Sequence, residues 1–275
     1  MKRIFGVLFL LPLGTVAALA QQQEKAPQMT HEMTEFWSPV PKVVTPGQSP
    51  SDAATPAPSD AIVLFDGKDL SQWEGAPDAD VLVKGKDMSK FKSSAGKTAQ
   101  WTIKDGVLTV NKAAGDIQTK QTFGDFQLHI EWRIPEDIAG SSQARGNSGV
   151  FLQGRYELQI LDSYHNETYV NGQAASIYKQ TAPLVNAMRK PGDWNVYDIL
   201  YTAPTFKEDG TYRTKPMVTV LQNGVLVQYN TVIQGTTPFI GLPQVAPQGN
   251  GPIRLQAHGD KSKPISFRNI WIRTL

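Results

Sequence analysis

The chain has 275 residues, of which 40% are hydrophobic and 19% charged, and it contains no cysteine. This length suits one large domain or two small ones, and the lack of cysteine excludes small folds that depend on disulfides. Without Lys2 and Arg3, the 27 Lys and Arg residues fall to 25, equal to the 25 Asp and Glu residues. This balance lacks the basic surplus of a nucleic-acid-binding protein, and it favours an uncharged ligand such as a sugar.

Residues 1–20 have the parts of a cleavable export signal. Lys2 and Arg3 form a positive start, a mostly apolar run follows, and Ala18-Leu19-Ala20 supplies small residues at the cleavage point. Pro12 interrupts the apolar run, which is shorter than the ~20 residues of a membrane-spanning helix. We therefore expect a periplasmic or secreted protein that leaves the membrane once the signal is cleaved. With no cysteine at the cleavage site, we expect no lipid anchor.

Residues 21–60 are rich in Pro, Ser, Ala and Gln, a composition typical of a linker. Phe36 and Trp37 lie within it, and an aromatic pair is better suited to docking on a domain than to solvent. We therefore expect this linker to be partly docked. The first strand pattern follows at 61–65, so we predict a single β-domain over residues 61–275.

From residue 61 onward, short strand patterns alternate with turn signals. The predicted strands are 61–65, 101–103, 107–110, 126–134, 148–153, 156–161, 194–201, 217–221, 225–229, 253–258 and 265–272. Asp105-Gly106 and Asn223-Gly224 predict tight hairpin turns. No segment after residue 20 keeps a helical period, so the sequence predicts an all-β domain with two packed antiparallel sheets.

Side chains alternate between the two faces of a strand, and here one face is polar in several strands. In Tyr156–Leu161, for example, Glu157 and Gln159 lie opposite Leu158 and Ile160. The polar positions selected in this way are Glu131, Arg133, Asn147, Gln153, Arg155, Glu157, Gln159, Asn195, Gln256 and His258. A face exposed only to water is the alternative, but such faces are usually rich in Thr and Lys. If these strands are neighbours, one sheet carries the carboxylates, amides and imidazole that bind sugar hydroxyls.

Six motifs resemble those of the 3-keto-disaccharide hydrolase family: LFDGKDLSQW, WTIKDGVLTV, GDFQLHIEWRIP, GNSGVFLQGRYELQILDSY, GDWNVYDI and PIRLQAHGD…ISFRNIWIR. The resemblance runs from Asp60 to Leu275. It implies an exported bacterial protein with a two-sheet antiparallel jelly roll of the concanavalin A-like or glucanase type. It also implies a substrate that is a disaccharide or glycoside whose C3 hydroxyl a partner sugar 3-dehydrogenase has oxidised to a ketone.

The resemblance implies a mechanism that needs one base, one acid and a stabiliser of an enolate. A C3 ketone acidifies the C2 proton, so a base can remove it while an acid protonates the glycosidic oxygen. Water then adds, and the net reaction is hydrolysis. At matching positions, Glu157 and His258 are the candidates for proton transfer. The candidates for substrate binding or enolate stabilisation are Glu131, Arg133, Asn147, Gln153, Arg155, Gln159, Asn195 and Gln256.

Several alternatives stay open at the level of sequence. Asp162 and His165 follow the Glu157 strand and could orient the site or join it in binding a divalent metal, although their spacing is not that of a metal site. The strand also resembles that of laminarinase-type glucanases, but Gln159 stands where the second carboxylate would be, which argues against a retaining glucanase. A non-catalytic, lectin-like carbohydrate-binding module is the main alternative to an enzyme, and a purely structural role is the last.

Overall fold

A computed structural model of the chain describes residues 28–46, 54–77 and 96–275. In these ranges the protein is a two-sheet antiparallel β-sandwich, as predicted. Its helical turns are short 3₁₀ segments: η1 (His31–Thr34), η3 (Ser142–Ala144) and η4 (Val170–Gly172). Among the described residues, no helix has the length and apolar character needed to cross a membrane. The predicted export signal lies outside the described residues.

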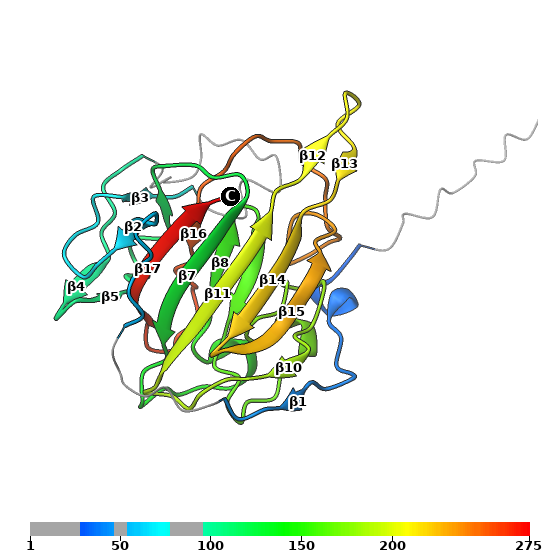
Figure 1. The fold of residues 1–275 in the computed structure, drawn as a ribbon. Helices are drawn as coiled ribbons and strands as arrows, with labels where there is room; N and C mark the ends of the chain where they lie inside the picture. The colour runs from blue at the N-terminus through cyan, green and yellow to red at the C-terminus, as the bar shows by residue number, and fades with distance from the viewer. Residues whose placement is uncertain (1–27, 47–53, 78–95) are drawn as a thin grey trace, which may run out of the picture.

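The larger sheet has eight strands in the order β15-β14-β11-β7-β17-β5-β4, and β2 also pairs with β17. Their bounds are β2 (Ile62–Phe65), β4 (Thr102–Lys104), β5 (Val107–Thr109), β7 (Phe126–Arg133), β11 (Trp194–Thr202), β14 (Met217–Gln222), β15 (Val225–Val232) and β17 (Ser266–Thr274). Figure 1 shows β15, β14, β11, β7 and β17 side by side, with β8 and β16 of the second sheet behind them.

The second sheet has five strands in the order β3-β6-β16-β8-β9. Their bounds are β3 (Trp73–Gly75), β6 (Ile117–Thr119), β8 (Ser148–Leu152), β9 (Tyr156–Ile160) and β16 (Arg254–Leu255). Two small pairs complete the described strands: β1 (Lys42–Val43) with β10 (Val185–Asn186), and β12 (Thr205–Phe206) with β13 (Tyr212–Thr214). Because β16 lies between β6 and β8, residues near 254 lie beside residues that are more than 100 positions earlier in the sequence.

Every strand predicted from the sequence overlaps a strand of the structure. The predicted strand 253–258 is shorter than expected, because only Arg254 and Leu255 keep the ladder pairing. Sequence patterns missed β1, β3, β6, β10, β12 and β13, which are two or three residues long and offer no alternation to detect. Both predicted hairpin turns form: β4 and β5 pair around Asp105-Gly106, and β14 and β15 pair around Asn223-Gly224, with positive φ at all four turn residues.

The core lies between the two sheets. The apolar positions of β7 and β9 meet there, and Ile130, Trp132, Leu158 and Ile160 have no exposed surface. Burying a side chain of this size contributes roughly 1.5–3 kcal/mol. Since the pleat sends alternate residues to opposite sides, burying this set commits Glu131 on β7 and Glu157 on β9 to the two outer faces of the sandwich.

Residues 28–46, which we call the N-terminal strap, lie against the domain. Asn171 accepts a hydrogen bond from Phe36 N at 2.9 Å and donates one to Thr34 O at 3.0 Å. The Phe36 and Trp37 side chains are both about half exposed, so the backbone of the strap makes the firmer attachment. The part of the predicted linker that the structure describes here is therefore docked.

Candidate active site

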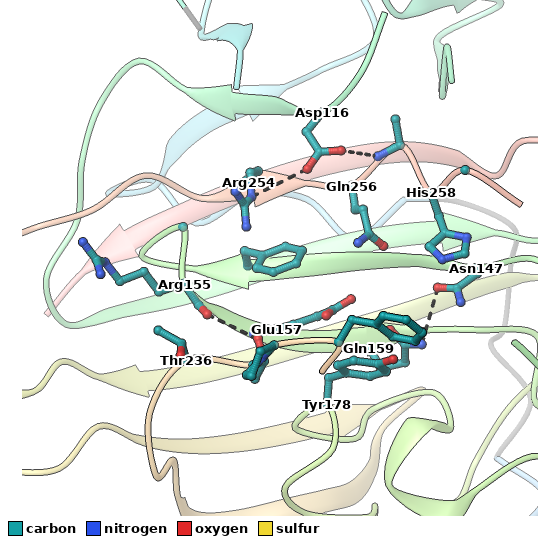
Figure 2. A pocket seen from close by; sticks show the side chains of 17 residues that line it. Asp116, Asn147, Arg155, Glu157, Gln159, Tyr178, Thr236, Arg254, Gln256 and His258 are labelled. Atoms are coloured by element: carbon teal, nitrogen blue, oxygen red, sulfur yellow. Dashed lines mark hydrogen bonds and ion pairs between the residues drawn. The ribbon is translucent and has the colours of Figure 1, made fainter. Parts of the chain in front are cut away.

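A cavity of about 310 Å³ opens on the outer face of the five-stranded sheet. This lies at the lower end of the ~300–1,000 Å³ that small-molecule sites occupy. Its floor comes from β8, β9 and the segment that begins at β16, and one wall comes from residues 236–239 (Figure 2). Its lining includes Asp116, Asn147, Phe151, Arg155, Glu157, Gln159, Tyr178, Thr237, Phe239, Arg254, Gln256 and His258.

The alternation of side chains along β9 places polar residues on the floor of the cavity. Glu157 and Gln159 are on the outer side of β9, opposite the core residues Leu158 and Ile160. On the neighbouring β8, Gly149 leaves room for the Glu157 carboxyl: a Cβ at this position would collide with Glu157 Oε1. The sequence places its glycine where the carboxyl group crosses the adjacent strand.

Glu157 is nearly inaccessible to solvent, at 5% exposed. Burial raises the pKa of its carboxyl to about 8, the positive charge of Arg254 opposes this rise, and the negative charge of Asp116 adds to it. At neutral pH, Glu157 is therefore mostly protonated and can donate a proton. A carboxyl group with this pKa is suited to general acid catalysis.

His258 lines the same cavity and is held by Asp260. Its Nδ1 lies 2.8 Å from Asp260 Oδ2, and the backbone N–H of Asp260 lies farther from the same nitrogen, at 3.2 Å. Burial opposes ionisation of Asp260, but hydrogen bonds from His258 and Ser262 and the charge of Lys112 hold the pKa of its carboxyl far below the usual range. Because the carboxylate carries no proton, Nδ1 donates to it. Nε2 is then left to accept a proton.

Arg254 supplies a buried positive charge at the cavity floor. Its guanidinium lies 4.0 Å from the centre of the Phe151 ring, and its Nε is 3.8 Å from Asp116 Oδ2. Asp116 also accepts a hydrogen bond from Ala257 N at 2.7 Å (Figure 2). The side chain of Arg254 is 2% exposed, so its charge acts at low effective dielectric constant. Such a charge can stabilise an anion that develops in the cavity.

The cavity brings together six of the ten residues that the sequence selected. These are Asn147, Arg155, Glu157, Gln159, Gln256 and His258. Gln256 Oε1 is buried and meets no hydrogen-bond donor among the described residues. A buried acceptor without a partner costs free energy, and a sugar hydroxyl would satisfy it.

Glu131 and Arg133, predicted from sequence to bind substrate, do not line this cavity, because the polar strands are not all neighbours in one sheet. Both are on β7 in the eight-stranded sheet, whose polar face is on the other side of the sandwich. Glu131 is buried beneath Arg268 and accepts a hydrogen bond from Asn269 at 2.8 Å. The Arg133 guanidinium lies 4.5 Å from the centre of the Trp194 ring.

Asn195 and Gln153 also lie away from the cavity. Asn195 is buried on β11 and accepts hydrogen bonds from Arg189 N and from the Asn223 side chain. Gln153 is at the turn between β8 and β9, where its amide donates to Phe123 O and accepts from the Tyr201 hydroxyl. Alternation identified both as polar positions. Their amides, however, form hydrogen bonds within the protein, which hold loops and strands together.

Asp162 and His165 do not combine with Glu157 into a metal site. Asp162 is buried and forms an ion pair with Arg145 at 2.8 Å, and it accepts a hydrogen bond from Tyr164 N. His165 is exposed and lies against the Tyr164 ring. In the described ranges, no three His, Cys, Asp or Glu side chains form a group that could hold a metal ion.

Sequence reasoning missed several residues of the cavity. Arg254 alternates with apolar Leu255 and Ala257 in the same way as Gln256 and His258, and Asp260 follows His258 by two residues, so both carried a signal. Asp116, Tyr178 and the wall at 236–239 come from loops with no strand pattern. Only the folded chain shows that these loops reach β9.

The fold and the cavity together define an antiparallel β-sandwich protein with a buried carboxyl and an Asp-bound histidine in one sugar-sized cavity. Residues 60–273 match the model of the 3-keto-alpha-glucoside-1,2-lyase-like domain. The chain belongs to this family.

The solved structures include a relative with high identity. It is provisionally described as a glycosyl hydrolase, comes from Parabacteroides distasonis ATCC 8503, and is 64% identical, with a TM-score of 0.74 over 90% of this chain and 97% of its own. A second protein from that organism with the same description is 20% identical, with a TM-score of 0.49 over 78% of this chain and 94% of its own. No curated protein sequence matches the chain. The family and the 64% identical relative together indicate an enzyme of the glycosyl hydrolase kind.

Proposed function

We propose that this protein cleaves 3-keto-disaccharides or 3-keto-glycosides by elimination followed by hydration. The observation that carries the proposal is that one cavity holds a buried carboxyl, Glu157, and a histidine, His258, whose Nδ1 is engaged by Asp260. Burial raises the pKa of the Glu157 carboxyl to about 8, which suits an acid, and Nε2 of His258 is left to accept a proton. A single acid and a single base suit an elimination, whereas ordinary glycosidases use two carboxylates. The family description, a 1,2-lyase-like domain, supports an elimination across C1 and C2.

The proposed steps balance in protons and electrons. His258 Nε2 takes the C2 proton, and the electron pair of the C–H bond forms an enolate with the C3 carbonyl. The enolate then collapses, which forms a C1–C2 double bond and breaks the bond from C1 to the glycosidic oxygen. Glu157 donates its proton to that oxygen as it leaves. Water finally adds across the double bond: Glu157 takes a proton from the water as its hydroxyl bonds to C1, and His258 returns its proton to C2, so both residues regain their starting states.

The remaining residues of the cavity bind and orient in this proposal. Arg254 places its buried charge near the enolate oxygen, where electrostatic stabilisation is most effective. Gln256 and Asn147 offer amide groups to the sugar hydroxyls, and Phe239 at the wall offers an aromatic face. Asp260 acts through His258 and keeps its tautomer.

We further propose export to the periplasm or the medium, on the basis of residues 1–20, and a functional partnership with a sugar 3-dehydrogenase that makes the 3-keto substrate. Export is checked by the mass of the mature protein, which should begin at Gln21. A mature chain that retains residues 1–20 would contradict it.

The direct test is turnover of 3-keto-trehalose and of a 3-keto-glucoside, followed by NMR of the released aglycone. We expect Glu157→Gln and His258→Ala to lower kcat/KM by about 10²–10⁴-fold, and Asp260→Asn to lower it through the wrong His258 tautomer. The matched control is Glu208→Gln, which changes an exposed carboxylate between β12 and β13, outside the cavity lining. A primary isotope effect with C2-deuterated substrate is expected if C2 deprotonation limits the rate.

Two outcomes would overturn the proposal. Hydrolysis of unoxidised glycosides with no dependence on the C3 ketone would indicate an ordinary glycosidase. Glycan binding that persists in the Glu157→Gln/His258→Ala double variant, with no turnover by the unmodified protein on any 3-keto substrate, would indicate a lectin-like binding module.

A further inference from the structure

A lysine outside the cavity, Lys112, contacts the loop that carries His258 and Asp260. This loop is the segment 256–265 between β16 and β17. The Nζ of Lys112 donates to Asp260 O and to Ser262 O, each at 2.8 Å, and lies 3.2 Å from Asp260 Oδ2. An ammonium group has three donors and no acceptor, and all three of these oxygens accept. Each donor of Lys112 therefore has a partner on this one loop.

Asp260 is a buried carboxylate whose two oxygens are both engaged. Its side chain is 4% exposed. Oδ2 lies 2.8 Å from His258 Nδ1, and Oδ1 accepts hydrogen bonds from Ser262 N at 2.7 Å and from the Ser262 hydroxyl. Hydrogen bonds alone do not offset the removal of a full charge from water, so a carboxylate in this position also favours a positive charge beside it.

Two groups can supply this positive charge. One is Lys112, and the other is His258 itself, whose ring becomes an imidazolium when Nε2 takes a proton. An imidazolium has no free nitrogen and could not accept the C2 proton of a substrate. A second cation beside the carboxylate lowers the electrostatic gain from that proton and so favours the neutral ring. Within the described ranges, Lys112 and His258 are the cationic side chains at ion-pair distance from Asp260.

The segment that carries Lys112 also compensates a second buried charge. Residues 110–116 connect β5 to β6. Four residues after Lys112, Asp116 approaches Arg254, whose Nε lies 3.8 Å from Asp116 Oδ2. One connection thus brings a cation to Asp260 and an anion to Arg254. Both buried charges of the β16 region are therefore offset by residues from the same segment.

We propose that Lys112 is a positioning residue for the base: it fixes the loop that carries Asp260 and compensates the Asp260 charge, so that Nε2 of His258 stays free to accept a proton. This inference rests on the proposed role of His258 as the base, and it adds a residue from outside the cavity to that role. Lys112 does not line the cavity and acts through Asp260.

The other charged groups near His258 have less influence on its ring. Lys261 and Lys263 flank the loop but are exposed, so solvent screens their charges. The Asp116–Arg254 pair carries no net charge. The buried carboxyl on β9, across the cavity, is mostly protonated at neutral pH. The balance between the Asp260 carboxylate and its lysine therefore dominates.

The first test is the pH dependence of kcat/KM in Lys112→Met, which keeps the bulk of the side chain and removes its charge. Without the lysine, the Asp260 carboxylate favours the imidazolium, so the low-pH limb of the profile should move to higher pH. We expect kcat/KM to fall about tenfold at pH 7, and the loss to shrink as the pH rises. A merely structural role would lower kcat/KM by the same factor at every pH.

The second test is ¹⁵N NMR of the His258 ring, which reads its protonation without any substrate. The signals are assigned by their loss in His258→Ala. At pH 7, Lys112→Met should move both ring nitrogens toward the imidazolium values relative to the unmodified protein. Lys112→Arg keeps the charge and the donors, so it should restore both the spectrum and the pH profile.

Three further variants separate the charge of Lys112 from its hydrogen bonds. Lys112→Gln can still donate to a loop carbonyl but carries no charge, so it should behave as Lys112→Met does, and it decides the question if Lys112→Met does not fold. In Lys112→Met/Asp260→Asn, the carboxylate charge is gone, so the limb should stay where Asp260→Asn alone puts it. Lys120→Met is the matched control, because Lys120 Nζ also donates to a backbone oxygen, Ser71 O at 2.7 Å, outside the cavity.

An unchanged low-pH limb and an unchanged His258 spectrum in folded Lys112→Met would overturn the inference. An equal shift in Lys112→Arg, or a further shift in the double variant, would do the same. If no 3-keto substrate is turned over, the proposed function fails, while the ¹⁵N spectrum still decides the role of Lys112.

Discussion

At the scale of single residues, the chemistry of the cavity depends on different environments for two groups. Glu157 is enclosed by the outer face of β9, the Gly149 gap and the 236–239 wall, where its backbone N–H also donates to Thr237 Oγ1 at 3.0 Å. The His258 side chain is about one-third exposed, and it forms a hydrogen bond with the ionised carboxylate of Asp260. Burial keeps a proton on the Glu157 carboxyl, and Asp260 orients His258 within the same cavity, so the two groups differ in environment as an acid and a base must.

The raised pKa of Glu157 has a cost in stability that can be measured. The folded state holds the proton up to about pH 8, whereas the unfolded state releases it near the ordinary glutamate pKa of 4.5, so stability falls as pH rises between these values. Glu157→Gln has no such proton, so it should raise Tm relative to the unmodified protein at pH 7.5 and change it little at pH 4. Thermal unfolding at both values checks this. An equal change in Tm at both would contradict it.

At the scale of elements, the N-terminal strap supports the cavity wall. Lys179 Nζ donates to His31 O of the strap at 2.7 Å and to Phe239 O of the wall at 2.8 Å. The His31 ring stacks on the Phe239 ring with 5.0 Å between their centres. The family match begins at residue 60, so this support lies outside the region that the family model covers.

Detaching the strap should therefore loosen substrate binding more than chemistry. In Lys179→Met, the hydrogen bond to the strap at His31 O and the one to the wall at Phe239 O are both lost. We therefore expect KM to rise on the order of tenfold, about 1.4 kcal/mol, with a smaller change in kcat. Lys190→Met, an exposed lysine away from the cavity, is the matched control. Steady-state kinetics on a 3-keto substrate separates the two constants. An unchanged KM would show that the wall holds its place without the strap.

At the scale of the whole molecule, the two outer faces of the sandwich carry different structural features. The five-stranded sheet carries the cavity, whereas the eight-stranded sheet carries a polar cluster that fastens another part of the N-terminal region. Glu131 accepts a hydrogen bond from Thr55 N at 3.1 Å, and Asn269 donates to Thr55 O at 2.7 Å. Nearby, Arg273 forms an ion pair with Asp60 at 2.7 Å.

Glu131 should accordingly contribute to stability. Burial disfavours its charge, but hydrogen bonds from His129, Asn269 and Arg268 outweigh it and lower its pKa to about 2. A lowered pKa stabilises the fold above the unfolded value of 4.5, and this contribution is lost as pH falls toward 2. Glu131→Gln should cost about 2–4 kcal/mol at pH 7, and less at pH 3, in urea unfolding. A weaker substrate affinity at unchanged stability would instead favour the binding role predicted from sequence.

The order of the elements and the class of fold were open to prediction because they depend on local patterns. Alternation in Phe126–Arg133 and Tyr156–Ile160 separates core from outer positions, and the Asp105-Gly106 and Asn223-Gly224 turns set their hairpins. The family motifs and the single carboxyl of the Glu157 strand were also readable along the chain, since they need no knowledge of spatial neighbours.

The sequence by itself thus determined that Glu131 and Glu157 both point away from the core, but not that they point in opposite directions. That was decided by which sheet each strand joins, a matter of pairing between segments far apart in the chain: β9 with β8, and β7 with β11 and β17. The protonation state of Glu157 was also decided by the tertiary structure. It depends on burial and on neighbours from other loops, such as Asp116 and Arg254, which a residue's place in a strand does not specify.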